Sequence, residues 1–407
     1  MATNNNNKAP NVPPLRFPEF KGEWKYSPLN EYLTENKERN KKGHFNKTDV
    51  LSVSGDFGIV NQIQLLGRSF AGKSVLDYHV VRYGNIVYTK SPLKEYPYGI
   101  VKINKGADGI VSTLYAVYNV KTNAYGKFIE SYFALPRRTN KYFKPIVRIG
   151  AKHDMKISNA EAIANIVCFP QYAEQQKIAE FLSLLDERIS TQNKIIEKLQ
   201  SLIKGLNDHI LKNIEGDQVC FADLGEAYGG LSGKSGDDFG CGDPFITYMN
   251  VYQNTYISEN DYELVQIAPD EKQNSVQYGD ALFTLSSETP EEVGMGAVYL
   301  GKSQKLYLNS FCFGVHFHGN RVLPQYIAHF ISSTSFRKAI YPLAQGSTRF
   351  NLQKQDFMRM KFVLPSLEEQ ERIATALDAL HNYLANEKLL TEQYLLLKQF
   401  LLQQMFI

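Results

Sequence analysis

The sequence predicts an α+β protein in which two related halves, each a mixed α/β domain followed by a long helix, are related by a pseudo-twofold axis. One observation is a motif that occurs twice: Pro170, Glu174-Gln175 and Ile178-Ala179 recur 195 positions later as Pro365, Glu369-Gln370 and Ile373-Ala374. The other is an apolar seam of helical spacing behind each copy. Solenoid repeats are much shorter than this, so we expect a tandem duplication of a globular domain with its helix.

The residues after the two prolines predict helices of about 40 residues, roughly 60 Å long. The chain leaves the first domain by one helix and returns from the second by the other, so we expect an antiparallel pair with one domain at each end. The residues expected at the helix–helix or subunit interface are Ile178, Leu182, Leu185, Ile189, Leu199, Leu206, Ile373, Leu377, Leu380, Leu384, Tyr394 and Leu401. Alternatively, each seam packs into its own globular domain.

Both globular halves show strand signals, because β-branched and aromatic runs are bounded by Gly or Asn. These runs cover residues 86–88, 101–103, 115–118, 245–248, 281–283 and 311–317. The repeat is expected to extend upstream, with Trp24 aligned to Val219. The expected organisation is a tail (1–20), a first domain (21–165), a first long helix (166–215), a second domain (216–362) and a second long helix (363–407), and each domain is expected to carry its own core.

Composition indicates an ordinary globular protein. Hydrophobic residues make up 43% and charged residues 21% of the 407 positions. The four cysteines form no C-x-x-C pair, which argues against a zinc site or a disulfide framework and favours a reducing, cytoplasmic compartment. No apolar run is long enough for a membrane span or a signal peptide.

Positive charge is concentrated at matching places in the two halves, over residues 137–156 and 337–361. Segregated basic residues suggest faces directed at a polyanion, whereas the alternative is that they only solvate loops. The candidate DNA-binding residues are Lys73, Ser74, Lys90, Arg137, Arg138, Arg148, Lys152, Lys234, Ser235, Arg349 and Lys354.

One segment, Gly67–Ser74, fits the phosphate-binding pattern G-x-x-x-x-G-K-S. Such a loop requires a preceding strand, for which 63–66 is the candidate, and a following helix. The residues after Ser74 instead indicate a turn into another strand. A nucleotide site is therefore the alternative function, and a loop that holds a DNA phosphate is the other interpretation. The Gly233–Ser235 loop has the same Gly-Lys-Ser sequence.

Other catalytic patterns are absent from the sequence. It contains no Asn-Pro-Pro-Tyr or Asp-Pro-Pro-Tyr methyltransferase motif and no G-x-S-x-G. His316 and His318 alternate on an expected strand, but no third metal ligand accompanies them. We therefore expect no cofactor or metal in this chain and no enzymatic activity of its own.

The duplicated arrangement resembles the specificity subunit of type I restriction–modification systems. The residues that carry the resemblance are Pro14–Pro18 with Trp24, Phe169-Pro170 with Glu174-Gln175, Leu364–Gln370 with Ile373-Ala374, Gly242–Ile246 and Tyr278–Asp280. The first helix start departs from the pattern, with Tyr172-Ala173 where the second copy has Leu367-Glu368.

The resemblance implies a DNA-binding subunit without catalytic activity. Each target recognition domain would bind one half of a bipartite site in double-stranded DNA, and the two helices would set the spacing. The helices would also dock two methyltransferase subunits that use S-adenosylmethionine, and restriction subunits would add ATP- and Mg-dependent chemistry. Besides the nucleotide-binding alternative, a coiled-coil scaffold without a role on DNA is the third hypothesis.

Overall fold

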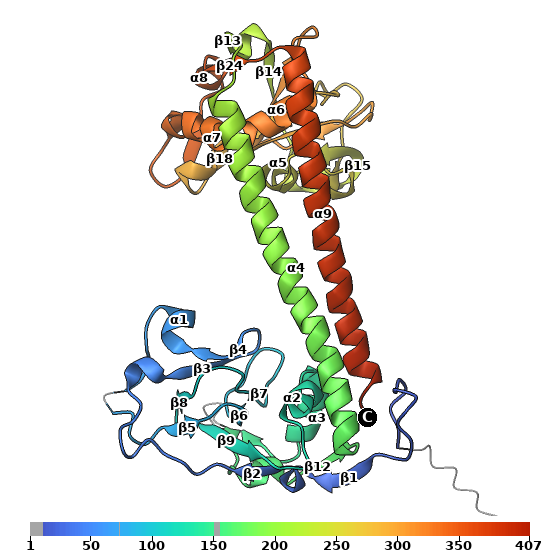
Figure 1. Ribbon diagram of the computed structural model, residues 1–407. Helices are drawn as coiled ribbons and strands as arrows, with labels where there is room; N and C mark the ends of the chain where they lie inside the picture. The colour runs from blue at the N-terminus through green and yellow to red at the C-terminus, as the bar shows by residue number, and fades with distance from the viewer. Residues whose placement is uncertain (1–10, 73, 150–154) are drawn as a thin grey trace, which may run out of the picture. The chain divides into compact units, whose positions relative to one another are not determined.

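The computed structural model describes residues 11–72, 74–149 and 155–407. The chain forms two compact units. The first contains the described residues of Met1–Gln192 together with Leu390–Ile407, and the second is Asn193–Leu389. Each unit therefore contains a globular part and a portion of both long helices (Figure 1).

The long helices are α4 (Tyr172–Lys212), of 41 residues, and α9 (Leu367–Gln404), of 38 residues. In the first unit the early turns of α4 pack with the last turns of α9, where Asp186 forms an ion pair of 2.5 Å with Lys398. In the second unit the late turns of α4 and the early turns of α9 pack on the same core. The predicted antiparallel pairing is confirmed.

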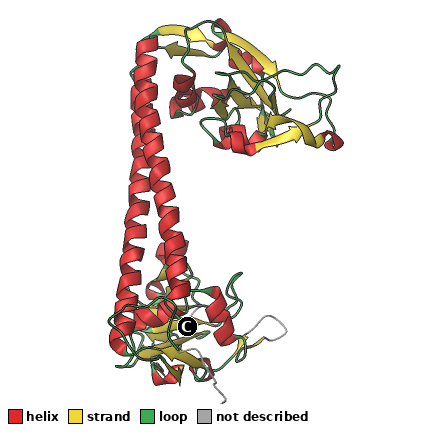
Figure 2. Ribbon diagram, turned by 90° about the vertical axis from the view of Figure 1, so that its right-hand side faces the viewer, coloured by secondary structure: helices red, strands yellow, loops and turns green. Residues whose placement is uncertain are grey.

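Strands, drawn yellow, lie in the globular part of each unit (Figure 2). Each unit contains a four-stranded antiparallel sheet, and the two sheets share one strand order. The first order is β2 (Leu33–Glu35), β9 (Tyr115–Val120), β6 (Ile86–Thr89), β7 (Val101–Ile103). The second order is β14 (Gly225–Gly229), β21 (Cys312–Phe317), β17 (Ala281–Thr284), β19 (Gly296–Val298). Five predicted strands fall in these sheets, and the shared order confirms the duplication.

The sixth predicted strand, 245–248, ends early. β15 (Phe239–Ile246) stops at Ile246 and α5 (Tyr248–Gln253) begins two residues later. The hydroxyl of Thr247 accepts the N–H of Asn250 at 3.2 Å, which caps the new helix.

Smaller elements complete the units. The paired strands are β1 (Lys25–Pro28) with β12 (Ile166–Phe169), β13 (Asp217–Cys220) with β24 (Lys361–Leu364), β3 (Leu51–Ser54) with β4 (Gly58–Asn61), β5 (His79–Val81) with β8 (Gly109–Val111), and β10 (Arg148–Ile149) with β11 (Met155–Lys156). Two three-stranded sheets have the orders β16 (Tyr262–Val265), β15, β20 (Tyr307–Leu308) and β18 (Ser286–Ser287), β23 (Phe350–Leu352), β22 (Ala344–Gln345). The shorter helices are α1 (Gln62–Leu66), α2 (Gly126–Tyr132), α3 (Pro136–Phe143), α6 (Pro324–Ile331), α7 (Thr334–Ile340) and α8 (Lys354–Met358).

Strand register corrects the alignment of the two domain starts. Lys25 in β1 and Asp217 in β13 face the last residues of β12 and β24, so the offset there is 192 positions. The expected match of Trp24 with Val219, at an offset of 195, is therefore wrong by three residues. The offset is still 192 at the starts of β2 and β14 but is 195 at the starts of β6 and β17, so the segments between these strands differ in length, which a fixed-offset comparison does not detect.

The repeated glutamine fastens each long helix to its domain. Gln175 Oε1 accepts the N–H of Tyr125 at 3.0 Å, and Gln370 Oε1 accepts the N–H of Leu323 at 2.8 Å. Each Nε2 donates to the carbonyl of the proline before the helix, at 2.9 Å in both cases. Both glutamines are buried, so each bond is made where a lost partner would leave an unsatisfied amide. The backbone leading into α2 or α6 is thereby tied to the start of α4 or α9.

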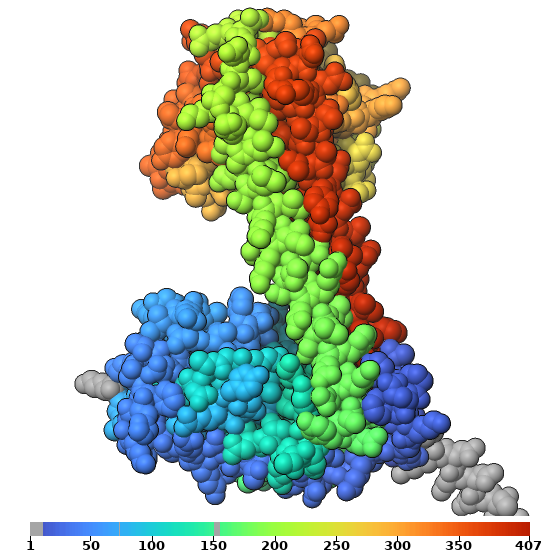
Figure 3. Space-filling view, viewed as in Figure 1, coloured from blue at the N-terminus to red at the C-terminus, as the bar shows by residue number. Residues whose placement is uncertain are grey.

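The core of the first unit includes the C-terminal end of the chain. Leu401, Leu402, Met405 and Phe406 pack with Ile178 and Leu182 of α4, and the first turns of α4 lie against the globular part (Figure 3). The ring of Phe406 lies 5.2 Å from Phe128 and 6.5 Å from Trp24. The expectation that each half carries its own core is therefore wrong for the first unit, because residues far apart in sequence complete it.

Equivalent positions in and beside the sheet strands hold a hydrogen-bonded polar triad in each unit, with a buried central residue. The triads are Asn36, Asn85 and Asn119 in the first unit and Tyr228, Asp280 and His316 in the second. Their central members lie at the starts of β6 and β17: Asn85 donates to Asn119 at 2.9 Å, and Asp280 lies 2.6 Å from His316 Nδ1. The scaffold is shared, whereas the chemistry of its polar positions has changed from neutral amides to ionisable groups.

We predict that replacing Phe406 with alanine destabilises the first unit by about 3–5 kcal/mol, since a buried aromatic ring would leave a cavity. Trp24 is the single tryptophan and is buried beside Phe406, so urea unfolding followed by tryptophan fluorescence measures this unit. The control is Phe400→Ala, because that ring is exposed on α9. Equal midpoints for the two variants would contradict the packing role of Phe406.

We also predict a pH dependence centred on His79 in β5. Burial, with Arg39 and Lys90 nearby, lowers the pKa of His79 to about 4. The unfolded chain has the ordinary value of about 6.5 and binds this proton more strongly. Stability is therefore full above pH ~6.5 and falls as the pH drops towards 4, by about 2 kcal/mol at pH 5. Urea unfolding at pH 7.5 and 5 should show this loss in the wild type, and His79→Gln should remove it from the difference.

Candidate nucleic-acid interface

The exposed face of α3 carries three cations in the first unit. Arg137, Lys141 and Lys144 are exposed, whereas Tyr142 and Phe143 are buried in the core. Spacings of four and three residues place the cations on one side of the helix. The apolar residues therefore fix α3 to the domain while its other side offers a row of positive charge to solvent.

The side chain of Arg138, next to Arg137, points into the protein and binds backbone carbonyls there. Its guanidinium donates to the carbonyls of Tyr132 and Leu402 at 2.9 and 2.8 Å and lies 4.8 Å from the centre of the Phe406 ring. Burial lowers the pKa of Arg138 to about 10. Leu402 belongs to the last turn of α9, so Arg138 satisfies a carbonyl that the helix leaves without an internal partner. This placement favours a structural role over a contact with DNA.

Lys90, at the end of the β6 strand, is half-buried. Its Nζ donates to Asn159 Oδ1 at 2.5 Å, and burial lowers the pKa of its ammonium group. Arg148 is exposed on the β10–β11 hairpin, close in sequence to α3. Lys152 lies outside the described residues.

The elements that flank Gly67–Ser74 are not those of a nucleotide-binding loop. Residues 63–66 are helical, within α1, and the left-handed Gly67 ends that helix. The helix forms because Asn61 caps it, accepting the N–H groups of Ile63 and Gln64. Ser74 accepts the N–H of Leu76 at 3.4 Å in a turn that leads into β5, and Lys73 lies outside the described residues. The expected strand before this loop was wrong.

The second Gly-Lys-Ser loop is paired internally. Lys234 Nζ donates to the carbonyl of Gln266 at 2.6 Å and forms an ion pair with Glu271. This ion pair is the main reason that the pKa of Glu271 falls to about 2. Ser235 Oγ donates to Asp238 at 2.9 Å. Neither side chain is presented to an external phosphate in this arrangement.

Arg349 and Lys354 are exposed in the second unit. Arg349 directly precedes β23, at the tip of the β22–β23 hairpin, and Gly346 begins this tip with φ +140°. A side chain at Gly346 would place Cβ 2.1 Å from the Arg349 carbonyl, so the tight tip requires glycine. By contrast, Arg337 of the same basic stretch donates to the carbonyls of Gly294, Glu291 and Val293.

The predicted seam residues divide between the domain cores and the helix pair. Ile178, Leu182 and Leu401 belong to the core of the first unit, and Ile373 and Leu377 to that of the second. Leu185 and Leu206 pack at the edges of these cores, and Leu384 is buried on α9. Half-buried positions are Ile189, Leu199, Leu380 and Tyr394. Tyr394 accepts a hydrogen bond of 3.3 Å from Arg188 of α4.

A polar joint that sequence reasoning missed holds α9 to the second unit. Tyr256 donates to Asp378 Oδ1 at 2.6 Å, and His329 Nε2 lies 2.8 Å from the same oxygen. Burial lowers the pKa of His329, although the Asp378 carboxylate opposes this shift. The three residues are distant in sequence and form no local motif, so the sequence alone does not predict this group.

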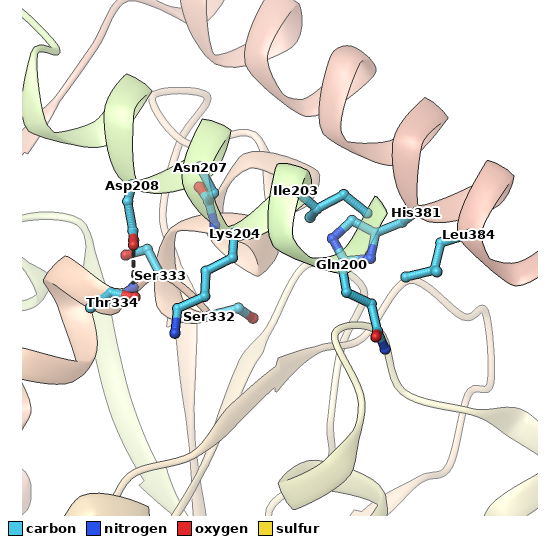
Figure 4. Close-up of a pocket in the computed structure, with 10 residues that line it drawn as sticks. All are labelled: Gln200, Ile203, Lys204, Asn207, Asp208, Ser332, Ser333, Thr334, His381 and Leu384. Atoms are coloured by element: carbon cyan, nitrogen blue, oxygen red, sulfur yellow. Dashed lines mark hydrogen bonds between the residues drawn. The ribbon is translucent and has the colours of Figure 1, made fainter. Parts of the chain in front are cut away.

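A pocket of about 230 Å³ lies beside this joint, between α4, α9 and the turn before α7 (Figure 4). Asp208 accepts the N–H of Thr334 at 3.0 Å, and Asn207 donates to the His329 carbonyl at 3.1 Å. These bonds anchor the end of α4, and none of the candidate DNA-binding residues that the structure describes lines the pocket. Within the described residues, no group of three or more His, Cys, Asp or Glu side chains is placed to hold a metal ion.

Comparisons with known proteins agree on one family. Residues 234–393 match the family model of the type I restriction modification DNA specificity domain. The EcoKI specificity subunit of the type I restriction enzyme of Escherichia coli (strain K12) is 25% identical over 264 residues, which are 56% of each chain. The match thus spans about half the length of that relative. In the described part of the chain, no helix is long and apolar enough to cross a membrane.

Solved structures resemble the chain over nearly its full length. A chain from a study of complex assembly and conformational transition in the type I R-M system aligns with a TM-score of 0.57 at 15% identity, covering 94% of this chain and 97% of that one. The HsdS subunit from Thermoanaerobacter tengcongensis gives 0.51 at 14%, covering 97% and 98%. The type I S subunit from M. genitalium gives 0.53 at 12%, covering 97% and 99%. At these identities the likeness establishes the fold.

The adjacent arginines form a matched pair for a prediction. Arg138→Ala should lower the stability of the first unit by about 1–3 kcal/mol, since buried carbonyls lose a donor, whereas Arg137→Ala should leave it unchanged. Arg137→Ala should instead weaken binding to duplex DNA of any sequence and reduce the slope of log affinity against log salt by about one unit. Unfolding by Trp24 fluorescence and binding at several salt concentrations measure the two effects.

Lys25→Ala provides the control, because Lys25 is exposed on β1, away from α3 in sequence. If Arg137→Ala binds DNA as tightly and with the same salt slope as Lys25→Ala, the α3 cations are only solvated charge.

Proposed function

The chain belongs to the family of type I restriction–modification specificity subunits, and on that premise we propose that it reads a bipartite site in double-stranded DNA, one half-site for each unit. The observation that carries this proposal is that the two units share one scaffold but expose different groups on it. The four-stranded sheets share strand order, whereas the exposed cations lie on α3 in the first unit and at Arg349 and Lys354 in the second. Two related but diverged surfaces suit an asymmetric site, because base readout depends on a few local side chains.

The proposed phosphate contacts of the first unit are Arg137, Arg148 and, outside the described residues, Lys73 and Lys152, with Ser74 next to Lys73 in the sequence. Arg349 and Lys354 are those of the second unit. Lys90, Lys234, Ser235 and Arg138 are weaker candidates, since their polar atoms already bind groups within the protein. Phosphate contacts position a protein on DNA, and base contacts select the sequence.

The long helices are proposed to set the distance between the half-sites and to dock two methyltransferase subunits and, in the full complex, restriction subunits. α9 exposes large apolar side chains in its second half. These are Leu389, Leu395, Leu396, Leu397 and Phe400. A row of exposed apolar side chains on one helix suits a protein partner.

Catalysis is assigned to the partners in this proposal. The methyltransferase subunits would supply S-adenosylmethionine chemistry, and the restriction subunits would supply ATP- and Mg-dependent steps. The chain itself would be non-catalytic and would act in the cytoplasm, where cellular DNA is modified. The fold at Gly67–Ser74 does not suit the nucleotide-binding alternative, because α1 occupies the position where a P-loop requires a strand.

The proposal predicts that exchanging the first recognition domain changes one half of the recognised site and leaves the other half unchanged. Residues 21–165 should be replaced by the corresponding domain of a related protein, and the last turns of α9 must be exchanged with them, since Leu401 and Phe406 complete that core. Co-expression with the methyltransferase partners and mapping of methylated adenines gives the readout. A simultaneous change of both half-sites would contradict independent reading, and no sequence-specific methylation by the wild type would refute the function.

A further inference from the structure

One turn has the same construction in both units. It precedes β9 at residues 112–115 and β21 at residues 309–312. In each turn the fourth N–H donates to the first carbonyl: Tyr115 to Ser112 at 3.1 Å, and Cys312 to Asn309 at 2.9 Å. The first side chain also accepts the third N–H, from Leu114 at 3.3 Å and from Phe311 at 2.9 Å. Such doubly bonded turns hold the third residue in one backbone conformation.

The third residue of each turn is a large apolar side chain that points away from the core. Leu114 is 67% exposed and Phe311 is 56% exposed. A single exposed apolar residue needs no explanation. Here, however, the two apolar residues occupy the same structural position in the two units, although the polar triads of these units have diverged. Each of the two residues is also held by its own rigid turn.

Backbone bonds relate each turn to a strand that leads to a cation. Thr89 pairs with Tyr115 at the end of the β6–β9 ladder, and the next residue, Lys90, is half-buried with its Nζ bonded to Asn159. In the second unit, Leu285 donates its N–H to the Phe311 carbonyl at 2.8 Å and accepts the N–H of Leu352 at 2.9 Å. Leu352 is in β23, two residues after the start of that strand at the Arg349 hairpin tip.

We propose that Leu114 and Phe311 are the apolar base contacts of the two half-sites, each entering a DNA groove from its turn while exposed cations of the same unit bind the backbone. This inference rests on the proposed function and names residues that select sequence. Apolar side chains read the thymine methyl group by direct contact in the major groove. Leucine and phenylalanine differ in shape, so the same position in the two units would favour different base pairs.

The turns also meet a mechanical requirement of base readout. A side chain that enters a DNA groove must stay extended away from its own domain. A turn with a fixed backbone keeps the side chain in that outward position. In each turn, the backbone N–H of the exposed apolar residue is already hydrogen-bonded within the turn. The turn therefore does not need to rearrange before its apolar side chain contacts a base. Binding therefore costs little ordering of the loop.

The experiment uses the complex of the full chain with its methyltransferase partners. Methylation mapping of the wild type first defines the recognised site, and a duplex carrying that site is the binding probe. Leu114→Ala should weaken binding roughly ten-fold and relax the mapped sequence in the half-site of the first unit only. Phe311→Ala should do the same in the other half-site. Leu114→Met, which keeps an apolar side chain of similar size, should retain most of the affinity.

Leu15→Ala is the matched control, because Leu15 is an exposed leucine of the first unit that lies beside the end of α9. Trp24 fluorescence verifies folding of the Leu114 variants, and circular dichroism verifies Phe311→Ala. If folded Leu114→Ala and Phe311→Ala match Leu15→Ala in affinity and mapped sequence, the inference is wrong while the proposed function stands. If either variant alters both half-sites, the assignment of one contact to each unit is overturned. Failure of the wild type to methylate a defined site would instead refute the function itself.

Discussion

The side-chain amides of two equivalent glutamines, one in each repeat, connect the long helices to the domains. Gln175 and Gln370 bind the proline carbonyl before the helix and the N–H of the residue before α2 or α6. Both bonds are buried, where a neutral amide can satisfy a donor and an acceptor at once without the desolvation cost of a charge. The direction in which each long helix leaves its domain therefore depends on these two side chains.

The second constraint is that the chain closes the first unit with its own end. The last turn of α9 and Phe406 supply apolar surface to the core that contains Trp24 and Phe128, and Arg138 satisfies a carbonyl of that turn. In the second unit, α4 arrives in the comparable role, with Asp208 and Asn207 bonded at the α6–α7 corner. Each globular part is thus completed by a helix that begins in the other half of the sequence, which couples helix packing to domain stability.

Charge acts in two ways within the same basic stretches. Arg137 and Arg349 remain in water, where they can neutralise phosphates, whereas Arg138 and Arg337 serve as donors to carbonyls inside the fold. Lys234 is neutralised by Glu271. The guanidinium group suits both uses, since its several donors can satisfy backbone carbonyls or a phosphate. Counting cations along the chain therefore overstates the charge that a polyanion encounters.

The sequence alone was sufficient to predict the duplication, the two long helices and five of the eight strands in the four-stranded sheets, because a helical seam and β-branched runs are patterns of neighbouring residues. It also located the two basic stretches, at residues 137–156 and 337–361. Tertiary structure alone decided which of Arg137 and Arg138 faces solvent, that Phe406 completes the first core, and that 63–66 is a helix capped by Asn61. These outcomes depend on partners that lie far away along the chain or on competing caps, and no local periodicity records which long-range contact will be made.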